Sequence, residues 1–438
     1  MVYCPTTIQR KRRNLIRYSI KIALWIYQLL WSIAIPCLRY NKRLQHGFQD
    51  RLLQNLPPKA DLWIQAASVG EAFLACEILQ NIQSPTPVKI HLTTNTLQGM
   101  EILQSCFHKT SPKPDNLSIY TAYFPFDQPS IMTRALHCIQ PKLIVLLESE
   151  LWPGLLGRCQ EEKIKVLVVN GRMTEKSLSK YILWPTLWKS LRPEKILAMS
   201  EEDCHRFSTL FGEESVELMH NIKFDRLEPS NNQKESDNPL YSVIQPDAQF
   251  VVLGSVRKEE ETEITHILND ITSRNSDMII GLFPRHMHRL NFWKKHLSEK
   301  IIRWKLRSEV TAPVQGGCVI LWDTMGELTA AYTLANAAFV GGSLAPVGGQ
   351  NFLEPLTCGL RPVIGPHWSN FYWIGKEIIE QKLVLQVNSW QDVSQFLLGS
   401  STDNSEREET RKDIMEYVHS RQGGTSKACN TIRSYLSA

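Results

Sequence analysis

The sequence predicts an α/β protein in which two Rossmann-like domains face a common cleft, preceded by an N-terminal membrane-anchor helix. Short apolar runs alternate with segments of helical length and polarity, which is typical of buried parallel strands in doubly wound sheets. A polar, proline-bounded segment divides this series in two, and a basic, apolar arm precedes it. With 438 residues, 43% of them hydrophobic, the chain is long enough for two cores.

The arm is distinguished by its charge. Residues 1–60 carry eleven Lys or Arg and one acid, which gives this segment a net charge of +10. Because the whole chain has a net charge of +5, the remaining residues have a net charge of −5. The apolar run at 22–38 lies between basic clusters and contains Trp25, Tyr27 and Trp31, residue types favoured at membrane interfaces. We therefore expect residues 1–50 to bind phospholipid, not nucleic acid, as a membrane anchor.

The mode of anchoring stays open in the sequence. The run is slightly shorter than the ~20 residues of a straight span, so a tilted span, an interfacial helix and a buried amphipathic helix are all compatible with it. The ten cysteines contain no C-x-x-C pair, which indicates neither a zinc site nor a disulfide framework. Reduced thiols fit a location on the cytoplasmic side.

The polar segment at 228–239 is the expected linker, and it separates a domain at 51–228 from a domain at 240–438. Ligands of open α/β sheets bind at the carboxyl ends of the strands, so both domains should present their strand-to-helix loops to the cleft. The expected strands are 62–66, 88–92, 117–124, 143–147, 166–169 and 196–199 in the first domain, and 250–253, 278–283, 318–322, 337–340 and 362–364 in the second.

Glu71 follows the first expected strand and opens an apolar helix. A carboxylate there is suited to take the proton of an attacking hydroxyl as a general base. The spacing Ser68-x-x-Glu71 is equally that of a capping box, in which the carboxylate only bonds back to the helix start. The residues alone leave both interpretations open.

The second expected domain repeats this form twice, at Thr324 to Glu327 and at Asn351 to Glu354. Helix capping explains the spacing, but helix starts also bind nucleotide phosphates, and carboxylates there accept hydrogen bonds from ribose hydroxyls. Glycines at 341, 342, 348 and 349 allow close backbone approach by a ligand. No G-x-G-x-x-G and no G-x-x-x-x-G-K-[ST] occurs, so neither dinucleotide nor phosphate-loop chemistry is indicated.

Charged side chains at other strand ends complete the candidate set. Arg285 and Lys223 are suited to oppose phosphate charge, although most such residues are solvated surface. Glu148 and Glu150 come at the end of the strand at 143–147, and alternation should point both toward the cleft. Alternatively, one of them caps the following helix and the other is solvated. Two histidines near Arg285 have no carboxylate cluster beside them, so no metal is expected.

The motifs AASVGE, ESELWPGLL, NGRMTEKS, NIKFD, FPRH, DTMGEL, FVGGSL, GGQNFLEP and GPHWSNF occur in this order. In this combination the chain resembles the Kdo transferases, which attach 3-deoxy-D-manno-octulosonic acid (Kdo) to the lipid A precursor. The resemblance implies an inverting GT-B glycosyltransferase of lipopolysaccharide core biosynthesis that uses CMP-Kdo without metal or cofactor. It also implies lipid IVA as acceptor, one or more Kdo residues added, and the cytoplasmic side of the cell inner membrane.

Carried over to this sequence, the resemblance makes Glu71 the general base, with Glu148 and Lys223 as transition-state stabilisers. Departures are visible at 254–259, where the family often has Ser-Thr-His-x-Gly-Glu, and at Gln350 and Phe352, where His and Pro are common. The alternative to an enzyme is a membrane-tethered nucleotide-binding protein that lacks turnover. The residues implied to hold CMP are Pro284, Arg285, Met325, Gly326, Glu327, Asn351, Phe352, Leu353 and Glu354.

Overall fold

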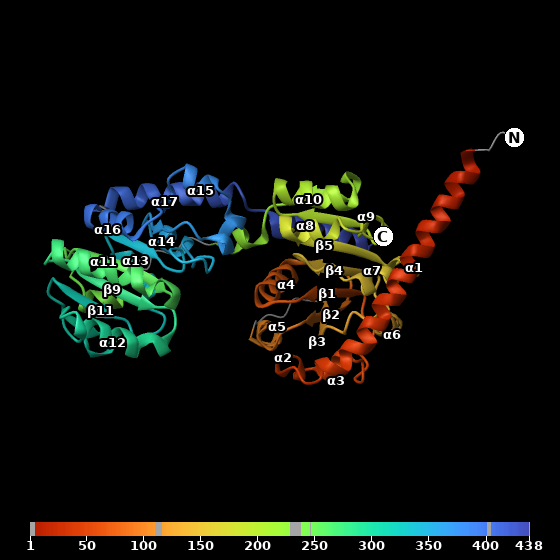
Figure 1. The fold of residues 1–438 in the computed structure, drawn as a ribbon, viewed down its shortest axis with the longest axis horizontal. Helices are drawn as coiled ribbons and strands as arrows, with labels where there is room; N and C mark the ends of the chain where they lie inside the picture. Colours follow the sequence, from red (N-terminus) through yellow and green to blue (C-terminus); the bar gives the residue numbers. More distant parts are fainter. Residues whose placement is uncertain (1–4, 110–115, 228–237, 246, 401–403, 438) are drawn as a thin grey trace. The chain divides into compact units, whose positions relative to one another are not determined.

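The computed structural model describes residues 5–109, 116–227, 238–245, 247–400 and 404–437 (Figure 1). The chain forms two compact units. Unit 1 contains Met1–Arg226 together with Arg421–Ala438, and unit 2 contains Leu227–Ser420. Each unit is built on one sheet of seven strands in which every neighbouring pair is parallel. The prediction of two Rossmann-like α/β domains is thereby confirmed.

The sheet of unit 1 has the strand order β3-β2-β1-β4-β5-β6-β7. The order reverses between β1 and β4, and ligands of such sheets bind beside the carboxyl ends of the strands at this switch point. The sequence missed β7, which is too short to form an apolar run. The strands are β1 Leu62–Ala66, β2 Val88–Thr94, β3 Leu117–Tyr123, β4 Leu143–Leu147, β5 Lys165–Gly171, β6 Lys195–Ala198 and β7 Val216–Leu218.

Unit 1 buries one apolar layer on each face of its sheet. Along β4, Ile144 and Leu146 join one core cluster, while Leu143, Val145 and Leu147 join the other. This alternation explains why β4 is apolar throughout: both faces are covered by helices. The helices are α4 Val69–Asn81, α5 Leu97–Lys109, α6 Pro129–Ile139, α7 Pro153–Glu162, α8 Glu175–Tyr181, α9 Pro185–Ser190, α10 Glu201–Phe211 and α18 Gly424–Leu436.

The N-terminal arm forms a single long helix, α1 (Pro5–Leu38), followed by the short α2 (Lys42–Gln45) and α3 (Phe48–Arg51). Its segment Ser19–Leu38 is long and apolar enough to cross a membrane by length and composition. Helix α1 runs past α6 and α7 of unit 1, as Figure 1 shows.

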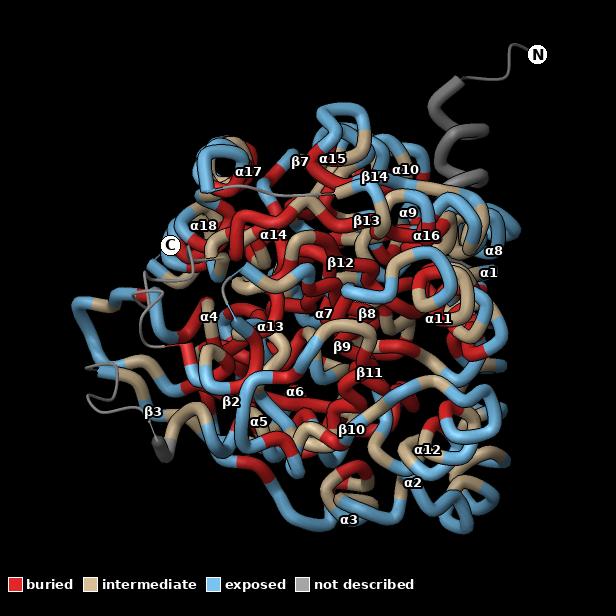
Figure 2. The backbone as a smooth tube through the Cα atoms, turned by 90° about the vertical axis from the view of Figure 1, so that its left-hand side faces the viewer, coloured by how far each residue is buried: buried red, intermediate tan, exposed pale blue. Residues whose placement is uncertain are grey.

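The sheet of unit 2 has the order β10-β11-β9-β8-β12-β13-β14, with its reversal between β8 and β12. Figure 2 shows buried residues concentrated along its strands. The sequence missed β10 and β14, which are the short edge strands. The strands are β8 Phe250–Val256, β9 Ile279–Pro284, β10 Trp304–Leu306, β11 Cys318–Leu321, β12 Ala337–Val340, β13 Val363–Ile364 and β14 Leu385–Gln386.

The helices of unit 2 cover both faces of its sheet. Helix α11 contributes Ile264, Leu268 and Ile271 to one core cluster, and Ala331 and Tyr332 of α13 belong to the other. The helices are α11 Glu261–Arg274, α12 Leu290–Glu299, α13 Leu328–Leu334, α14 Leu353–Thr357, α15 Glu377–Glu380, α16 Trp390–Gly399 and α17 Asn404–His419.

The structure corrects the assignment of the whole segment 240–438 to the second domain, because residues 421–438 belong to unit 1. Ala428, Cys429 and Ile432 of α18 are buried in the core cluster of unit 1. Asp225 accepts hydrogen bonds from the backbone N–H groups of Gly423 and Thr425, both at 2.6 Å, and so caps α18. The expected linker at 228–239 lies, except for its last two residues, outside the described residues.

Candidate active site

Glu71 lies in the first turn of α4, directly after β1. Ser68 is the N-cap of this helix, and its hydroxyl accepts from the Glu71 N–H at 3.4 Å. The Glu71 carboxylate accepts from the Ala67 N–H at 2.6 Å and from the Ser68 hydroxyl at 3.1 Å. The capping geometry is therefore present, with the carboxylate bound to the residue before the cap.

The charge state of Glu71 separates it from an ordinary cap. Its side chain is only 6% exposed, and burial raises its pKa to about 8. The neighbouring carboxylates of Glu150 and Glu148 also raise the pKa, while the Ala67 N–H and Ser68 lower it. A carboxyl group that titrates near neutrality is suited to general-base chemistry, so capping and proton transfer are compatible roles for one residue.

Glu148 directly follows β4, the strand beside β1 at the switch point of unit 1. Its backbone is left-handed, with φ +52°, and is held by hydrogen bonds to Val169 and Arg172. Its carboxylate pairs with the Lys223 ammonium at 2.8 Å, and the two side chains are 15% and 27% exposed. The structure thus brings together two residues that are 75 positions apart in the sequence.

Glu150 is a further member of this group that the resemblance did not assign a role. Its carboxylate accepts from the Trp152 indole N–H at 2.7 Å. Burial raises its pKa, and Trp152 and Gln65 lower it through hydrogen bonds. Glu71, Glu148 and Glu150 form an acidic cluster at the carboxyl ends of β1 and β4, with Lys223 as its cationic partner.

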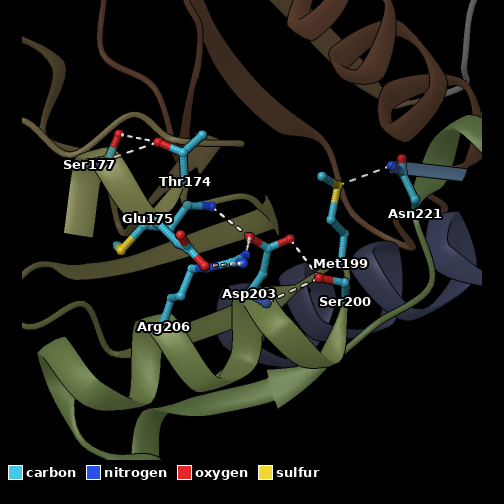
Figure 3. A network of polar contacts seen from close by, with 9 residues as sticks. Thr174, Glu175, Ser177, Met199, Ser200, Asp203, Arg206 and Asn221 are labelled. Atoms are coloured by element: carbon cyan, nitrogen blue, oxygen red, sulfur yellow. Dashed lines mark hydrogen bonds and ion pairs between the residues drawn. The ribbon is translucent and has the colours of Figure 1, made fainter. Parts of the chain in front are cut away.

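Lys223 is positioned by the motif around it. Asn170, in a left-handed conformation at the end of β5, accepts from the Ile222 N–H at 3.0 Å. Asn221 accepts from the Lys223 N–H at 3.0 Å and donates to the Met199 sulfur at 3.0 Å, a contact drawn in Figure 3. Both asparagines therefore serve as scaffold for the segment that carries the lysine.

The same scaffold extends to the start of α10 (Figure 3). Ser200 caps this helix by accepting from the Asp203 N–H at 3.1 Å, and Asp203 accepts from the Met173 N–H at 2.8 Å. Arg206 lies 3.5 Å from Asp203 and 3.9 Å from Glu175. These contacts join the NGRMTEKS motif to the start of α10.

In unit 2, Pro284 and Arg285 are placed at the carboxyl end of β9, as the sequence predicts. The Arg285 N–H donates to Val256 at the end of β8, at 2.8 Å. Its guanidinium donates to the Gln350 amide oxygen at 3.1 Å. Gln350, one of the departures from the family pattern, therefore orients the arginine.

Glu327 is held inside unit 2 by three side chains. Its carboxylate accepts from Arg307 at 2.9 Å, from the Trp322 indole at 2.8 Å and from the Thr324 hydroxyl at 2.7 Å. The expected cap at Thr324 is corrected, because α13 begins at Leu328 with Glu327 itself at the cap position. The Thr324 hydroxyl instead donates a hydrogen bond to the Glu327 carboxylate.

The loop before Glu327 is open to solvent. Met325 is 75% exposed, and Gly326 has φ +87°, a backbone conformation that glycine adopts without strain. A Cβ atom at Gly326 would meet nothing within 4 Å. The glycine is therefore required by backbone conformation and not by packing.

The expected cap at Asn351 is also corrected, because Phe352 occupies the cap position of α14. Asn351 accepts from the Leu353 N–H at 3.2 Å, and Glu354 accepts from the Thr329 hydroxyl at 2.5 Å. The side chains of Phe352 and Leu353 are buried. A ligand would therefore meet these two residues through their backbone groups.

Glu260 is a structural residue of unit 2 that the sequence did not reveal, because it lies one position beyond the segment 254–259 and belongs to no motif named above. It is fully buried, and its carboxylate accepts from the backbone N–H groups of Arg257 at 2.9 Å, Gly342 at 2.5 Å and Leu344 at 3.4 Å. It joins the loop after β8 to the glycine-rich loop after β12, across the switch point of the sheet. A Cβ atom at Gly341 would lie 2.6 Å from this carboxylate, so the glycine leaves room for it.

Among the residues that the structure describes, no group of three or more His, Cys, Asp and Glu side chains is arranged to hold a metal ion. His286 and His288 stack on each other with their ring centroids 5.5 Å apart. Desolvation lowers the pKa of His286, and repulsion by the cationic neighbours Arg257 and Arg285 lowers it further. Arg257 and Arg285, which follow β8 and β9, therefore lie close enough to His286 to act on its charge.

Comparison with solved structures defines the class. A glycosyltransferase from Rickettsia africae is similar in fold, with a TM-score of 0.52 over 86% of this chain and 99% of that one, at 10% sequence identity. Two doubly wound units with this likeness identify the fold as that of the GT-B glycosyltransferases.

Sequence comparison defines the family. Residues 39–226 match the family described as 3-deoxy-D-manno-octulosonic-acid transferase. A 3-deoxy-D-manno-octulosonic acid transferase of Haemophilus influenzae is 29% identical over 93% of this chain and 94% of its own length. A bifunctional glycosyltransferase/methyltransferase of Fusobacterium nucleatum is 30% identical over 90% of this chain and 59% of its own length. Residues 39–226 thus match the Kdo transferase family, and nearly the whole chain is similar to a Kdo transferase.

Proposed function

We propose that this protein transfers Kdo from CMP-Kdo to the lipid A precursor lipid IVA, adding one or more Kdo residues during lipopolysaccharide core biosynthesis. The reaction takes place at the cytoplasmic side of the cell inner membrane and inverts the anomeric centre. The match of residues 39–226 to the Kdo transferase family and the similarity to a Kdo transferase over 93% of the chain support the donor sugar. The observation that carries the mechanism is the buried Glu71 carboxyl group, with a pKa of about 8, beside the Glu148–Lys223 pair.

In this mechanism Glu71 removes the proton from the acceptor hydroxyl. The oxygen then attacks the anomeric carbon of Kdo, and the bond from that carbon to the phosphate oxygen breaks, so that CMP leaves with the electron pair. The Glu148–Lys223 pair provides preorganised charge for the transition state. A pKa near 8 suits the base, since a carboxyl group of ordinary pKa would be a much weaker proton acceptor.

The carboxyl ends of the unit 2 strands are proposed to hold CMP. Arg285, oriented by Gln350, is suited to bind phosphate. The left-handed Gly326 allows backbone approach, and Glu327 keeps the loop in place through its three hydrogen bonds. The full proposed set is Pro284, Arg285, Met325, Gly326, Glu327, Asn351, Phe352, Leu353 and Glu354, and it includes neither a metal nor a cofactor.

The decisive experiment measures Kdo transfer to lipid IVA from CMP-Kdo by the full-length protein, with mass spectrometry of the lipid product. Glu71→Gln should lower kcat/KM by about 10²–10⁴-fold, equivalent to about 3–5 kcal/mol of barrier, because the base is lost. The matched control is Glu202→Gln, an exposed position in the first turn of α10, which should retain activity. The product mass also counts the Kdo residues added.

Two results would count against the proposal. Unchanged turnover by Glu71→Gln would remove this residue from the mechanism. Binding of CMP in calorimetry without any lipid product from the wild-type protein would favour the tethered nucleotide-binding alternative.

A further inference from the structure

Helix α1 is tied to unit 1 by a buried carboxylate. The Tyr27 hydroxyl donates to Asp127 at 2.9 Å, and Asp127 is 1% exposed. The same carboxylate accepts from the backbone N–H groups of Gly154 at 2.8 Å and Leu155 at 2.7 Å, at the start of α7. Tyr27 therefore completes the hydrogen bonding of a group that is an integral part of unit 1.

Two further polar side chains on the same face of α1 also bind unit 1. The Gln28 amide donates to the Ser130 hydroxyl at 3.0 Å and accepts from the Ser130 N–H at 2.9 Å. One turn later, the Ser32 hydroxyl accepts from the Gln128 amide at 2.8 Å. These contacts are specific in geometry, which distinguishes α1 from a helix that only lies near the domain.

Apolar packing continues along this face. A Cβ atom at Gly157 of α7 would lie 2.9 Å from a methyl group of Leu24, so the two helices approach closely. Trp31 packs on Phe126 with ring centroids 5.6 Å apart, and Leu38 packs on the same core cluster. The docked segment from Leu24 to Leu38 covers about 22 Å of helix at 1.5 Å per residue.

The opposite face of α1 is apolar and exposed. Large side chains recur there at helical spacing, and their aromatic member is of the type that favours membrane interfaces. The basic residues Lys21, Arg39, Lys42 and Arg43 flank this face in the sequence, which suits the anionic surface of a bilayer. The face consists of Ile22, Trp25, Ile26, Leu29, Leu30 and Ile33.

We propose that α1 inserts this outer face into a single leaflet of an anionic phospholipid bilayer while its inner face stays docked on unit 1, so that the helix does not cross the membrane. A hydrocarbon core of about 30 Å needs about 20 apolar residues surrounded by lipid. In α1 the apolar segment is the 20 residues Ser19–Leu38, and from Leu24 to Leu38 one face of it is docked on unit 1. A span would require the Tyr27, Gln28 and Ser32 hydrogen bonds to break.

The inference rests on the membrane association proposed above, and the first experiment separates the two. Full-length protein with an N-terminal epitope tag is bound to preformed vesicles of phosphatidylethanolamine and phosphatidylglycerol, floated on a density gradient, and treated with protease from outside. Flotation with complete cleavage of the tag is expected, because the N-terminus stays on the side of the catalytic units. Flotation with a protected tag would overturn the single-leaflet mode, and absence of flotation would overturn the membrane association itself.

The second experiment locks α1 in its docked position. In a variant with Cys4 and Cys37 replaced by Ser, the pair Gln28→Cys and Ser130→Cys is joined by a short thiol cross-linker, and the variant carrying Gln28→Cys alone is the control. The locked protein should float with vesicles to the same extent as the control. Loss of flotation on locking would show that α1 must leave unit 1 to bind lipid, which contradicts the proposal.

A matched pair of substitutions tests the outer face. Ile33 is 71% exposed on α1, and Ile301 is 93% exposed in unit 2. Ile33→Glu should abolish flotation, whereas Ile301→Glu should leave it unchanged. Retained flotation of Ile33→Glu would remove this face from the lipid contact.

Discussion

Glu71 combines a structural and a proposed chemical role because opposing influences act on one carboxyl group. Donation from Ala67 and Ser68 favours its charged form, as in any capping arrangement. Burial and the nearby carboxylates of Glu150 and Glu148 favour its neutral form more strongly. The resulting pKa of about 8 allows the group to change its protonation state near physiological pH.

This pKa predicts the pH dependence of the reaction. Because the base acts when deprotonated, kcat/KM should rise with pH along a limb centred at about 8. Glu150→Gln removes the larger of the two repulsive charges, so the limb should move to lower pH. Initial rates from pH 5.5 to 9.5 test this, with Glu202→Gln as the control that keeps the wild-type limb. A limb that stays in place in Glu150→Gln would contradict the coupling.

The same pKa predicts a pH-dependent stability. The folded-state pKa of Glu71 is raised from an ordinary value of 4.5, so its contribution is fully present below about pH 4.5 and is lost as pH rises through about 8. The wild-type free energy of unfolding, relative to Glu71→Gln, should therefore fall between these values, by at most about 1.4 kcal/mol per pH unit. Urea titrations of both proteins at pH 5, 7 and 9 measure this difference, and a constant value would be incompatible with the raised pKa.

The Glu148–Lys223 pair is expected to be energetically coupled, since both side chains are largely buried and lie 2.8 Å apart. A double-mutant cycle of Glu148→Gln and Lys223→Met should give a coupling energy of about 0.5–3 kcal/mol in unfolding. The exposed pair Lys295 and Glu299, on α12, provides the comparison and should give less than about 0.5 kcal/mol. Equal coupling in the two cycles would indicate that burial does not strengthen the site pair.

At the scale of elements, the glycine-rich loop of unit 2 depends on a carboxylate from a neighbouring segment. Glu260→Ala leaves the buried Gly342 N–H and the partly buried Leu344 N–H without their acceptor, and the buried donor alone costs about 1–3 kcal/mol. The variant should lose stability and bind CMP more weakly in calorimetry. Glu259→Ala is the matched control, because Glu259 is exposed and its carboxylate pairs with Arg257 at the surface. Wild-type CMP affinity in Glu260→Ala would show that the loop holds its shape without this residue.

At the scale of the whole molecule, the chain leaves unit 1 after Arg226, builds unit 2 and returns with α18. Unit 1 is therefore completed only by the last residues of the chain. Helix α18 buries Ile432 against the core of unit 1, and Asp225 caps it from the point where the chain leaves. The C-terminal helix thus stabilises the unit that carries the acidic cluster.

This connection predicts that Ile432→Ala destabilises unit 1 by about 2–5 kcal/mol, because a buried side chain is truncated. Hydrogen exchange followed by mass spectrometry should show the loss of protection in β4 and β5, which contact α18, with unit 2 unaffected. The exposed Ser434→Ala on the same helix is the control. Loss of protection confined to unit 2 would contradict the assignment of α18.

The sequence by itself determined the two α/β layers, because a strand covered on both faces must be apolar throughout, as β4 and β9 are. It placed Glu71, Glu148 and Arg285 at strand ends for the same reason. The sequence did not predict the short edge strands β7, β10 and β14, because each contains a polar residue and is partly exposed, so that it forms no continuous apolar run.

Only the tertiary structure decided the rest. Residues distant in the chain meet there, as in the pairing of Glu148 with Lys223, the reach of Glu260 to Gly342, and the return of α18 to unit 1. The pKa of Glu71 also depends on burial and on neighbouring charges, which no local pattern contains. Periodicity reports which side of an element is buried, whereas these properties depend on which other element covers it.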